Sequence, residues 1–506
     1  MLSKIIKIII FVIVIAFALI FMYLFDLPPF NEGKNQEQPV PQNTESEQNP
    51  FIDEKEIEKA EASLPEELKE SPDRIARTKT YEEIIKRAQL LENGEFNTLA
   101  IAEYQNAYLK NPSKIDPLYE IGRLHIEIGN FDKAQKTYEL ILEKDPESID
   151  AKIYLGKALL NQREIQKARD IFDAIESDEF IVKYYQGILA AYYEDHAKAK
   201  QLLQNVAESS PDQELKANAE SFLNAYREFD FNVESPSIHL KVLLARSYNQ
   251  VEEYEIAIPL LFTVTKEKLD YRDAWILLGY AYLKTEKYMD AIEALERAKV
   301  LDPQKAETNF FLGIAYYTIN DYEKAEDFLL KARDLNFQPK IQIDQKLAEI
   351  YLQQKNYEKA ALNYSNVLAI NDQDINYYIR PIWIYIEKLQ QPEKALELSK
   401  LALESHPRNA MSHNLMAWSL IYNENFELAE SHLNQAMAID PNLDAVYLNY
   451  GILFEQQGDL NKAVNFYKKA HNLGSGSGVS GIAANRYNSV IAKIYNKNIQ
   501  VNTLAQ

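Results

Sequence analysis

Residues 275–303 read WILLGYAYLKTEKYMDAIEALERAKVLDP, and this stretch decides the fold that the sequence predicts. Small residues stand at Gly279 and Ala291, twelve positions apart, and each lies among apolar residues at helical spacing. Pro303 ends the stretch, because proline cannot continue a helix. The stretch therefore predicts two short antiparallel helices whose backbones approach closely at the small residues.

The same arrangement recurs along the chain, mostly in steps of 34 residues. Polar pairs such as Asn320-Asp321 and Gly458-Asp459 separate the two expected helices of a unit and favour a turn. One hairpin cannot bury its apolar face, whereas stacked hairpins bury a continuous core. The small positions of the first helices are Ala88, Gly122, Gly156, Gly187, Ala245, Gly279, Gly313, Ala348, Trp383, Ala417 and Gly451, and an alanine follows each after twelve residues.

This pattern resembles the tetratricopeptide repeat family, whose unit carries Trp, Leu, Gly and Tyr in its first helix and Ala, an aromatic residue, Ala and Pro in its second. The best matching unit has Trp275, Leu278, Gly279, Tyr282, Ala291, Leu295, Ala298 and Pro303. We count eleven units between about residue 81 and residue 477. The resemblance implies an all-α fold, a right-handed solenoid of helical hairpins.

One segment lies outside the repeat period, and we divide the array there. Residues 214–231 read as one extra amphipathic helix. We assign a first array of about four repeats to residues 71–213, the extra helix to 214–237, and a second array of about seven repeats to 238–477. We expect the superhelix to change direction at the extra helix. Residues 478–506 are expected to form a capping helix and tail.

Two units depart from the pattern. The unit that begins near Ile149 is three residues short. The unit over residues 376–409 has Trp383 at its small position and Pro381 inside its first helix. Because a proline inside a helix removes a hydrogen bond and clashes with the preceding turn, we expect that helix to be kinked or shifted.

The N-terminal residues predict a membrane anchor. Residues 8–25 are an apolar run close to the roughly 20 residues that cross a bilayer core. We therefore assign residues 1–26 to an uncleaved transmembrane signal anchor; the alternative, a cleaved signal peptide, would require small residues where 21–25 are bulky. Lys4 and Lys7 precede the run, which predicts a cytoplasmic N-terminus and an extracytoplasmic repeat domain, periplasmic or on the cell surface. Residues 27–70 read as a disordered acidic tether.

Composition and motifs disfavour several function classes. The net charge of −21 argues against nucleic acid as a partner, because phosphate binding needs clustered Lys and Arg. The chain has no cysteine, so it has no disulfide or thiolate site. His406 and His413 are the closest of the seven histidines, but Pro407 separates them and they share no helical phase. We therefore predict no catalytic residue, no metal site, no cofactor and no small-molecule substrate, and conclude that the protein is not an enzyme.

The resemblance implies that the first helices line a concave groove that binds peptide or helical segments of other proteins. Aromatic residues and Arg are enriched at binding hot spots, although aromatic residues also pack between helices in this family. We expect the protein to be a membrane-anchored interaction scaffold in envelope complex assembly or protein quality control. The alternatives are a cytoplasm-facing adaptor and a non-catalytic subunit of a transferase or secretion complex. The predicted groove residues are Arg123, Tyr184, Tyr192, Arg246, Tyr280, Phe310, Tyr317, Arg380 and Trp418.

Overall fold

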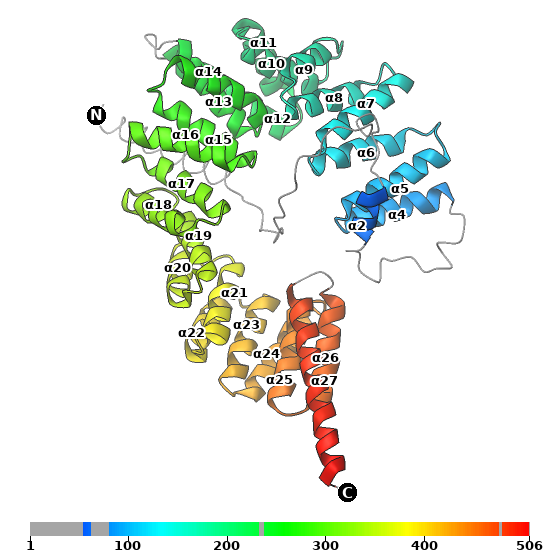
Figure 1. Ribbon diagram of the computed structural model, residues 1–506, viewed down its shortest axis with the longest axis vertical. Helices are drawn as coiled ribbons and strands as arrows, with labels where there is room; N and C mark the ends of the chain where they lie inside the picture. The colour runs from blue at the N-terminus through cyan, green and yellow to red at the C-terminus, as the bar shows by residue number, and fades with distance from the viewer. Residues whose placement is uncertain (1–53, 62–79, 232–236, 475–477, 505–506) are drawn as a thin grey trace. The chain divides into compact units, whose positions relative to one another are not determined.

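The computed structural model describes residues 54–61, 80–231, 237–474 and 478–504, which hold helices and no strand. The chain packs as two compact units (Figure 1), the first ending at Phe311 and the second beginning at Leu312. The division falls inside one helix, α17 (Ala306–Thr318). Each unit is described by itself.

The first unit is a succession of antiparallel helical hairpins with one additional helix, α12. Consecutive helices pack against one another from α4 to α16. The helices are α2 (Glu54–Glu61), α4 (Tyr81–Asn93), α5 (Asn97–Lys110), α6 (Asp116–Glu127), α7 (Phe131–Lys144), α8 (Ile149–Asn161), α9 (Ile165–Asp173), α10 (Phe180–Tyr192), α11 (His196–Ser209), α12 (Gln213–Phe231), α13 (Ser237–Gln250), α14 (Tyr254–Glu267), α15 (Arg272–Lys284) and α16 (Tyr288–Leu301).

The second unit continues the hairpins and ends in a long helix. That last helix, α27, packs against both α25 and α26. The helices are α18 (Tyr322–Asp334), α19 (Lys340–Gln353), α20 (Tyr357–Ile370), α21 (Asn376–Trp383), the π-helical turn η3 (Ile384–Lys388), α22 (Pro392–Ser405), α23 (Ala410–Tyr422), α24 (Phe426–Ile439), α25 (Asp444–Gln456), α26 (Leu460–Leu473) and α27 (Gly478–Leu504).

Where the small position of a first helix is glycine, it receives a large side chain from the second helix of the same hairpin. A methyl group added to Gly156 would lie 2.4 Å from the ring of Phe172, and one added to Gly451 would lie 2.4 Å from the ring of Tyr467. Gly279 faces Leu295 in the same way, at 2.5 Å. In each case the large residue comes sixteen positions after the small one, so the repeat period also sets the packing.

The turns inside the hairpins follow a common geometry. Asn320 adopts a left-handed backbone with φ 62°, and Gly129 and Gly458 adopt φ 75° and 81°. The next residue then starts the second helix, as Asp321 does when its carboxylate accepts a hydrogen bond from the backbone N–H of Lys324. The pairs Asn320-Asp321 and Gly458-Asp459 therefore form the turns that the sequence predicted, because the first residue reverses the chain and the aspartate caps the following helix.

The extra helix is integrated into the core of the first unit. α12 packs between α11 and α13, and its buried Phe222 lies in an edge-to-face contact with Tyr248 of α13, with ring centroids 4.8 Å apart. A single apolar cluster runs from Ala88 through α12 to Ala294. Thus the core is continuous across the segment at which we divided the array.

The first helix of the unit that contains Pro381 is irregular, as the sequence predicted. Pro381 falls inside α21, and the helix then widens into the π-helical turn η3. The backbone N–H of Leu389 bonds to the carbonyl of Ile384, five residues back, at 2.9 Å. Since proline removes one hydrogen bond and pushes on the preceding turn, a change of helical register follows directly after it.

The N-terminal predictions are only partly within the described residues. The membrane anchor, residues 1–26, and most of the tether lie outside them. In the described part of the chain, no helix has both the length and the apolar character needed to cross a membrane. Inside the range assigned to a disordered tether, α2 is an ordered helix that packs on α5, because its Ile57 and Ala60 contact the apolar core.

Candidate functional site

The candidate site is the first-helix face of the array, which we define as the side chains that first helices direct away from the second helices of their own hairpins. The nine predicted groove residues all come from first helices. Their environments fall into three groups: apolar residues buried in the core, arginines held by carboxylates, and residues that keep part of their surface open.

Three predicted groove residues are buried in the first unit. Tyr184, Phe310 and Tyr280 expose 3%, 4% and 8% of their surfaces. The ring of Tyr280 lies 5.4 Å from that of Phe311, and the ring of Tyr184 meets that of Tyr185 edge-on at 5.3 Å. Little of these three side chains is therefore open to a partner in this structure, and their predicted role in partner binding stays a prediction.

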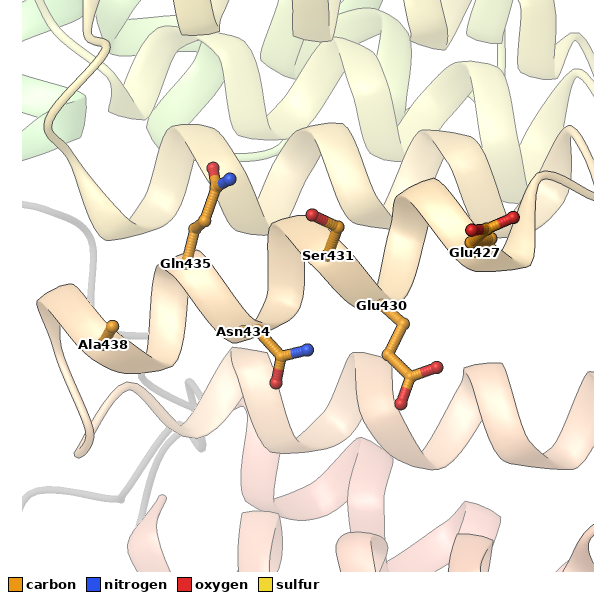
Figure 2. A pocket seen from close by; sticks show the side chains of 6 residues that line it. All are labelled: Glu427, Glu430, Ser431, Asn434, Gln435 and Ala438. Carbon is orange, nitrogen blue, oxygen red and sulfur yellow. The ribbon is translucent and has the colours of Figure 1, made fainter.

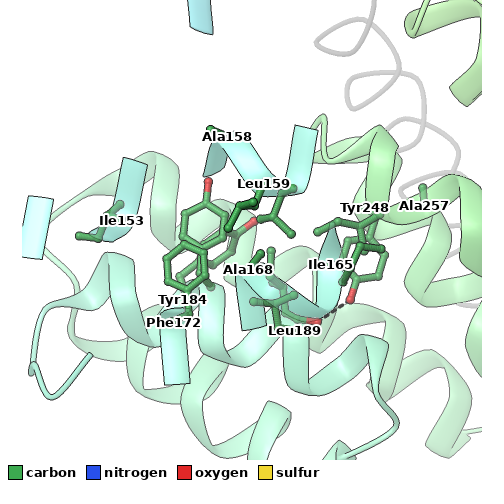
Figure 3. Close-up of a cluster of buried hydrophobic side chains, with 14 of the residues drawn as sticks. Ile153, Ala158, Leu159, Ile165, Ala168, Phe172, Tyr184, Leu189, Tyr248 and Ala257 are labelled. Atoms are coloured by element: carbon green, nitrogen blue, oxygen red, sulfur yellow. Dashed lines mark hydrogen bonds between the residues drawn. The ribbon is translucent and has the colours of Figure 1, made fainter. Parts of the chain in front are cut away.

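The first-helix face between α8 and α14 closes on itself. Arg163, in the turn after α8, forms an ion pair with Glu255 of α14, although 92 residues separate them. The hydroxyl of Tyr248 donates to the backbone carbonyl of Ile188, which joins α13 to α10. Figure 3 shows Tyr184 and Tyr248 within this buried cluster.

Two irregularities of the repeat lie within this segment. Helix α9 has 9 residues, against 14 in the second helices of the neighbouring hairpins, α7 and α11. The extra helix α12 is inserted after α11. We attribute the closure to these two irregularities.

A carboxyl group lies inside the closed segment. Burial raises the pKa of Glu253, the residue before α14, to about 7, although a hydrogen bond from Tyr185 and the ammonium group of Lys157 act in the opposite direction. Burial also lowers the pKa of Lys157. The Lys157 ammonium group lies 5.4 Å from the centre of the Tyr185 ring. The closed segment thus contains two half-buried ionisable groups of opposite charge, packed beside Tyr185.

Both predicted arginines of the first unit are engaged by carboxylates. Arg123 forms ion pairs with Glu92, Glu120 and Glu127. Arg246 forms an ion pair with Glu228 of α12. These guanidinium groups therefore hold adjacent helices together, and an incoming acidic partner would have to compete with those carboxylates.

The second unit keeps more of its first-helix face open. Arg380 of α21 is exposed, and Trp418 of α23 and Tyr317 of α17 are half-buried. The ammonium group of Lys346 lies 4.4 Å from the centre of the Tyr317 ring and 2.5 Å from the carboxylate of Glu349. Tyr192 of the first unit is also half-buried. Aromatic and charged groups thus alternate along this face of the second unit.

Sequence reasoning missed a polar cluster at the C-terminal end of this face. Arg486 of α27 donates to the hydroxyl of Tyr422 at 3.3 Å and lies 3.5 Å from Glu455 and 3.7 Å from Glu387. Tyr467 donates to Glu455 at 2.6 Å. A signal was present, because Arg486 follows Ile452 by 34 residues and so occupies the groove position of a twelfth first helix.

The N-terminal end of the array carries the same combination of residues. Tyr104 donates to Glu92 at 2.9 Å, and Arg123 of the next first helix pairs with the same carboxylate. We call each of these sets, Glu92–Tyr104–Arg123 and Glu455–Tyr467–Arg486, a terminal triad. Burial raises the pKa of Glu455, but hydrogen bonds from Lys493 and Tyr467 outweigh it and lower the pKa overall.

A depression of about 470 Å³ lies on the opposite face, along α24. It is shallow and open to solvent, and Figure 2 shows that its side chains all come from this one helix. The lining residues are Glu427, Glu430, Ser431, Asn434, Gln435 and Ala438. A polar surface of this kind does not enclose a small molecule. Within the described ranges, no group of three or more His, Asp or Glu side chains is arranged to hold a metal ion.

Comparison with known families identifies the repeats. Models of the tetratricopeptide repeat match residues 119–180, 242–306, 276–338 and 445–473. The chain contains tetratricopeptide repeats. With the helices described above, it is an all-α solenoid of such repeats.

Several curated relatives also match. The chain is 24% identical to a BBSome complex member from Bos taurus over 248 residues, which are 48% of this chain and 42% of the relative. It is 22% identical to anaphase-promoting complex subunit 3 from Schizosaccharomyces pombe over 354 residues, 69% of this chain and 49% of the relative. A peroxisomal targeting signal receptor from Saccharomyces cerevisiae is 25% identical over 243 residues, 45% of this chain and 39% of the receptor. Each match spans less than half of the relative.

Solved structures of similar architecture include yeast Tom70 and MamA. Tom70 is 14% identical, with 83% of this chain and 99% of Tom70 covered and a TM-score of 0.30. MamA is 26% identical, with 32% of this chain and 94% of MamA covered and a TM-score of 0.30.

Proposed function

We propose that this protein is an interaction scaffold that binds segments of other proteins along the first-helix face of its second unit. The observation that carries the proposal is the contrast between the two units. In the first unit this face is closed by its own side chains between α8 and α14, whereas in the second unit Arg380 is exposed and Trp418 is half-exposed. α21 and α23, which carry these two residues, are neighbouring first helices that pack against each other.

The chemistry of this surface favours a short segment with one acidic and one apolar side chain. Arg380 supplies a guanidinium group that pairs with a carboxylate in a bidentate manner. Trp418 supplies a large, partly open indole beside the apolar cluster of α21 and α23, and such an aromatic anchor is typical of binding hot spots. One of the relatives is a peroxisomal targeting signal receptor, and binding of segments of other proteins by this chain agrees with that relative's name.

The test is site-specific photo-crosslinking in the native host. A photoreactive amino acid at position 418 is expected to capture discrete partners, and the crosslinked peptides, identified by mass spectrometry, should share an acidic residue near an apolar one. A synthetic copy of the captured segment should then bind the purified chain, and Arg380→Ala with Trp418→Ala should weaken binding by about tenfold or more per hot-spot residue.

The matched control places the same photoreactive group at Lys468, an exposed residue on the second helix α26. Equal capture from both positions, or unchanged peptide affinity in the double variant, would assign binding to another surface. Circular dichroism of the variant shows whether the fold is intact, so that a loss of binding is not confused with unfolding.

We further propose that residues 1–26 anchor this scaffold in a membrane, with the repeats on the extracytoplasmic side, periplasmic or at the cell surface. The support is the apolar run at residues 8–25 and the lysines that precede it. Protease added to spheroplasts should cleave a C-terminally tagged chain. Protection until lysis would instead favour a cytoplasm-facing adaptor that recruits soluble proteins.

A further inference from the structure

Two histidines meet in the second unit at a place that the proposed scaffold function does not use. His413 lies on α23 and His432 on α24, the two antiparallel helices of one hairpin. Their Nδ1 atoms are 3.1 Å apart, and their ring planes are inclined by 31°. The pair therefore presents two ring nitrogens to each other across the helix interface.

The hydrogen bonds around the pair favour one tautomer of His413. Its Nε2 lies 3.2 Å from the backbone carbonyl oxygen of Pro407. A carbonyl oxygen only accepts hydrogen bonds, so Nε2–H donates to it. In the neutral form of that tautomer, Nδ1 carries the lone pair and lies 3.1 Å from Nδ1 of His432.

His432 completes the pair as a half-buried imidazole whose Nδ1 faces that of His413. In the absence of another ligand, its Nδ1–H donates to the lone pair of His413. A shift of this proton to the Nε2 of His432 leaves two neutral rings whose lone pairs face the same point, with no net gain or loss of protons.

We propose that His413 and His432 form a chelating site for a divalent transition-metal ion that prefers imidazole ligands, with Cu²⁺ bound most tightly. With metal–nitrogen bonds of about 2.0–2.1 Å, the 3.1 Å separation of the nitrogens corresponds to an angle of about 100° at the metal. The bond from Nε2–H of His413 to Pro407 is the outer contact that metal-bound histidines usually make.

The surroundings define what kind of ion fits. His413 exposes 8% of its surface and His432 is half-buried, so solvent reaches the pair from the side of α24. Because the described residues offer no third side-chain ligand, water completes the coordination. Mg²⁺ and Ca²⁺ prefer oxygen ligands and are excluded, whereas Cu²⁺ leads the divalent series for nitrogen sites and Zn²⁺ and Ni²⁺ follow.

The experiment is a Cu²⁺ titration of the full chain, prepared without a histidine tag and freed of metal with a chelator. Calorimetry at pH 7.5 is expected to show one site that His432→Gln and His413→Gln each weaken by at least tenfold. Electron paramagnetic resonance of the loaded protein should show hyperfine coupling to two nitrogens, and binding should fall away as the pH drops below about 6, where imidazole takes up protons.

The control is His406→Gln, which removes another histidine of the same region, whose ring bonds to the carbonyl of Asp372 and lies edge-on to Tyr378, away from the pair. Its affinity for Cu²⁺ should equal that of the native chain. His432 is the less buried of the pair, so His432→Gln is the variant to rely on if His413→Gln does not fold. Absence of binding, unchanged affinity in His432→Gln, or coupling to fewer than two nitrogens would each overturn the proposal and leave a simple N–H···N hydrogen bond.

Discussion

Glu253 illustrates how a residue in the closed segment couples stability to pH. Its pKa is raised to about 7 mainly by burial. A carboxyl group with a raised pKa binds protons more tightly in the folded than in the unfolded chain. Below the unfolded pKa of about 4.3, the raised pKa of Glu253 does not change the free energy of unfolding. Above pH 7, where the group is ionised in both states, it lowers the free energy of unfolding by its full amount.

We expect Glu253→Gln to stabilise the first unit at pH 8, because the variant no longer buries a charge. The free energy of unfolding should rise by about 1–3 kcal/mol at pH 8, and this gain should disappear at pH 4. Thermal unfolding of the native chain and the variant at both pH values measures the difference. Glu252→Gln changes the same charge at an exposed neighbour and should show no such pH-dependent gain. A gain that is equal at the two pH values would contradict this account.

A second residue-scale prediction concerns the small positions. In Gly156→Ala, the added methyl group lies 2.4 Å from the ring of Phe172, which is fully buried and cannot move away. The free energy of unfolding should fall by about 1–2 kcal/mol, since overpacking outweighs the gain in helix propensity. Gly481→Ala is the control, because nothing lies within 4 Å of its added methyl group. That variant should be unchanged or slightly more stable in a chemical denaturation series.

At the scale of the element, α27 occupies the position of the first helix of a twelfth hairpin. Its Arg486 stands where groove residues stand in the other first helices, and it reaches Glu455 and Tyr422 in the preceding ones. The outward side of α27 carries the exposed polar residues Asn485 and Asn488. The helix therefore covers the apolar face of α25 and α26, while its own outward side mixes these polar residues with the exposed Ile482, Ile491 and Tyr495.

We expect Arg486→Ala to weaken the C-terminal end of the second unit. The half-buried guanidinium contacts a phenol and two carboxylates, so its removal leaves Glu455 and Glu387 without that partner and should cost about 1–2 kcal/mol. Hydrogen exchange followed by mass spectrometry should show faster exchange in α25–α27. Lys468→Ala, on the exposed side of α26, should leave these rates unchanged. Equal exchange in the native and Arg486→Ala chains would show that the triad does not stabilise the cap.

The elements show where sequence reasoning succeeds and where it stops. Periodicity predicts helices, turns and the kink at Pro381, because these depend on local preferences and on contacts within one hairpin. It did not predict that Tyr184 and Tyr280 are buried, because their burial depends on contacts between hairpins. The pairing of His413 with His432 was not predicted for a related reason. The two residues lie on different helices, and the spacing of ligands along one helix does not reveal such a pair.

At the scale of the whole molecule, the repeat period identifies the class of the fold but does not show which part of the first-helix face is open to a partner. The eleven predicted units look alike in sequence, yet the first-helix face is closed in one segment and open in another. The closed segment is bridged by contacts distant in sequence, such as Arg163 with Glu255 and Tyr248 with the carbonyl of Ile188, which no local pattern marks. The surface that we propose for partner binding, around Arg380 and Trp418, is therefore a small part of the groove that the sequence predicted.

The pair of Arg163 and Glu255 also has a mechanical meaning. When each hairpin of a stack contacts only its neighbours, the stack extends under tension through small rotations between neighbouring hairpins. We call each contact between neighbouring hairpins a joint. A tie between α8 and α14 bypasses the joints between them, so the segment from α8 to α14 cannot lengthen until that tie and the Tyr248 bond to Ile188 separate. Under tension, this part of the chain should act as a stiff block, and extension should be taken up by the hairpins outside it.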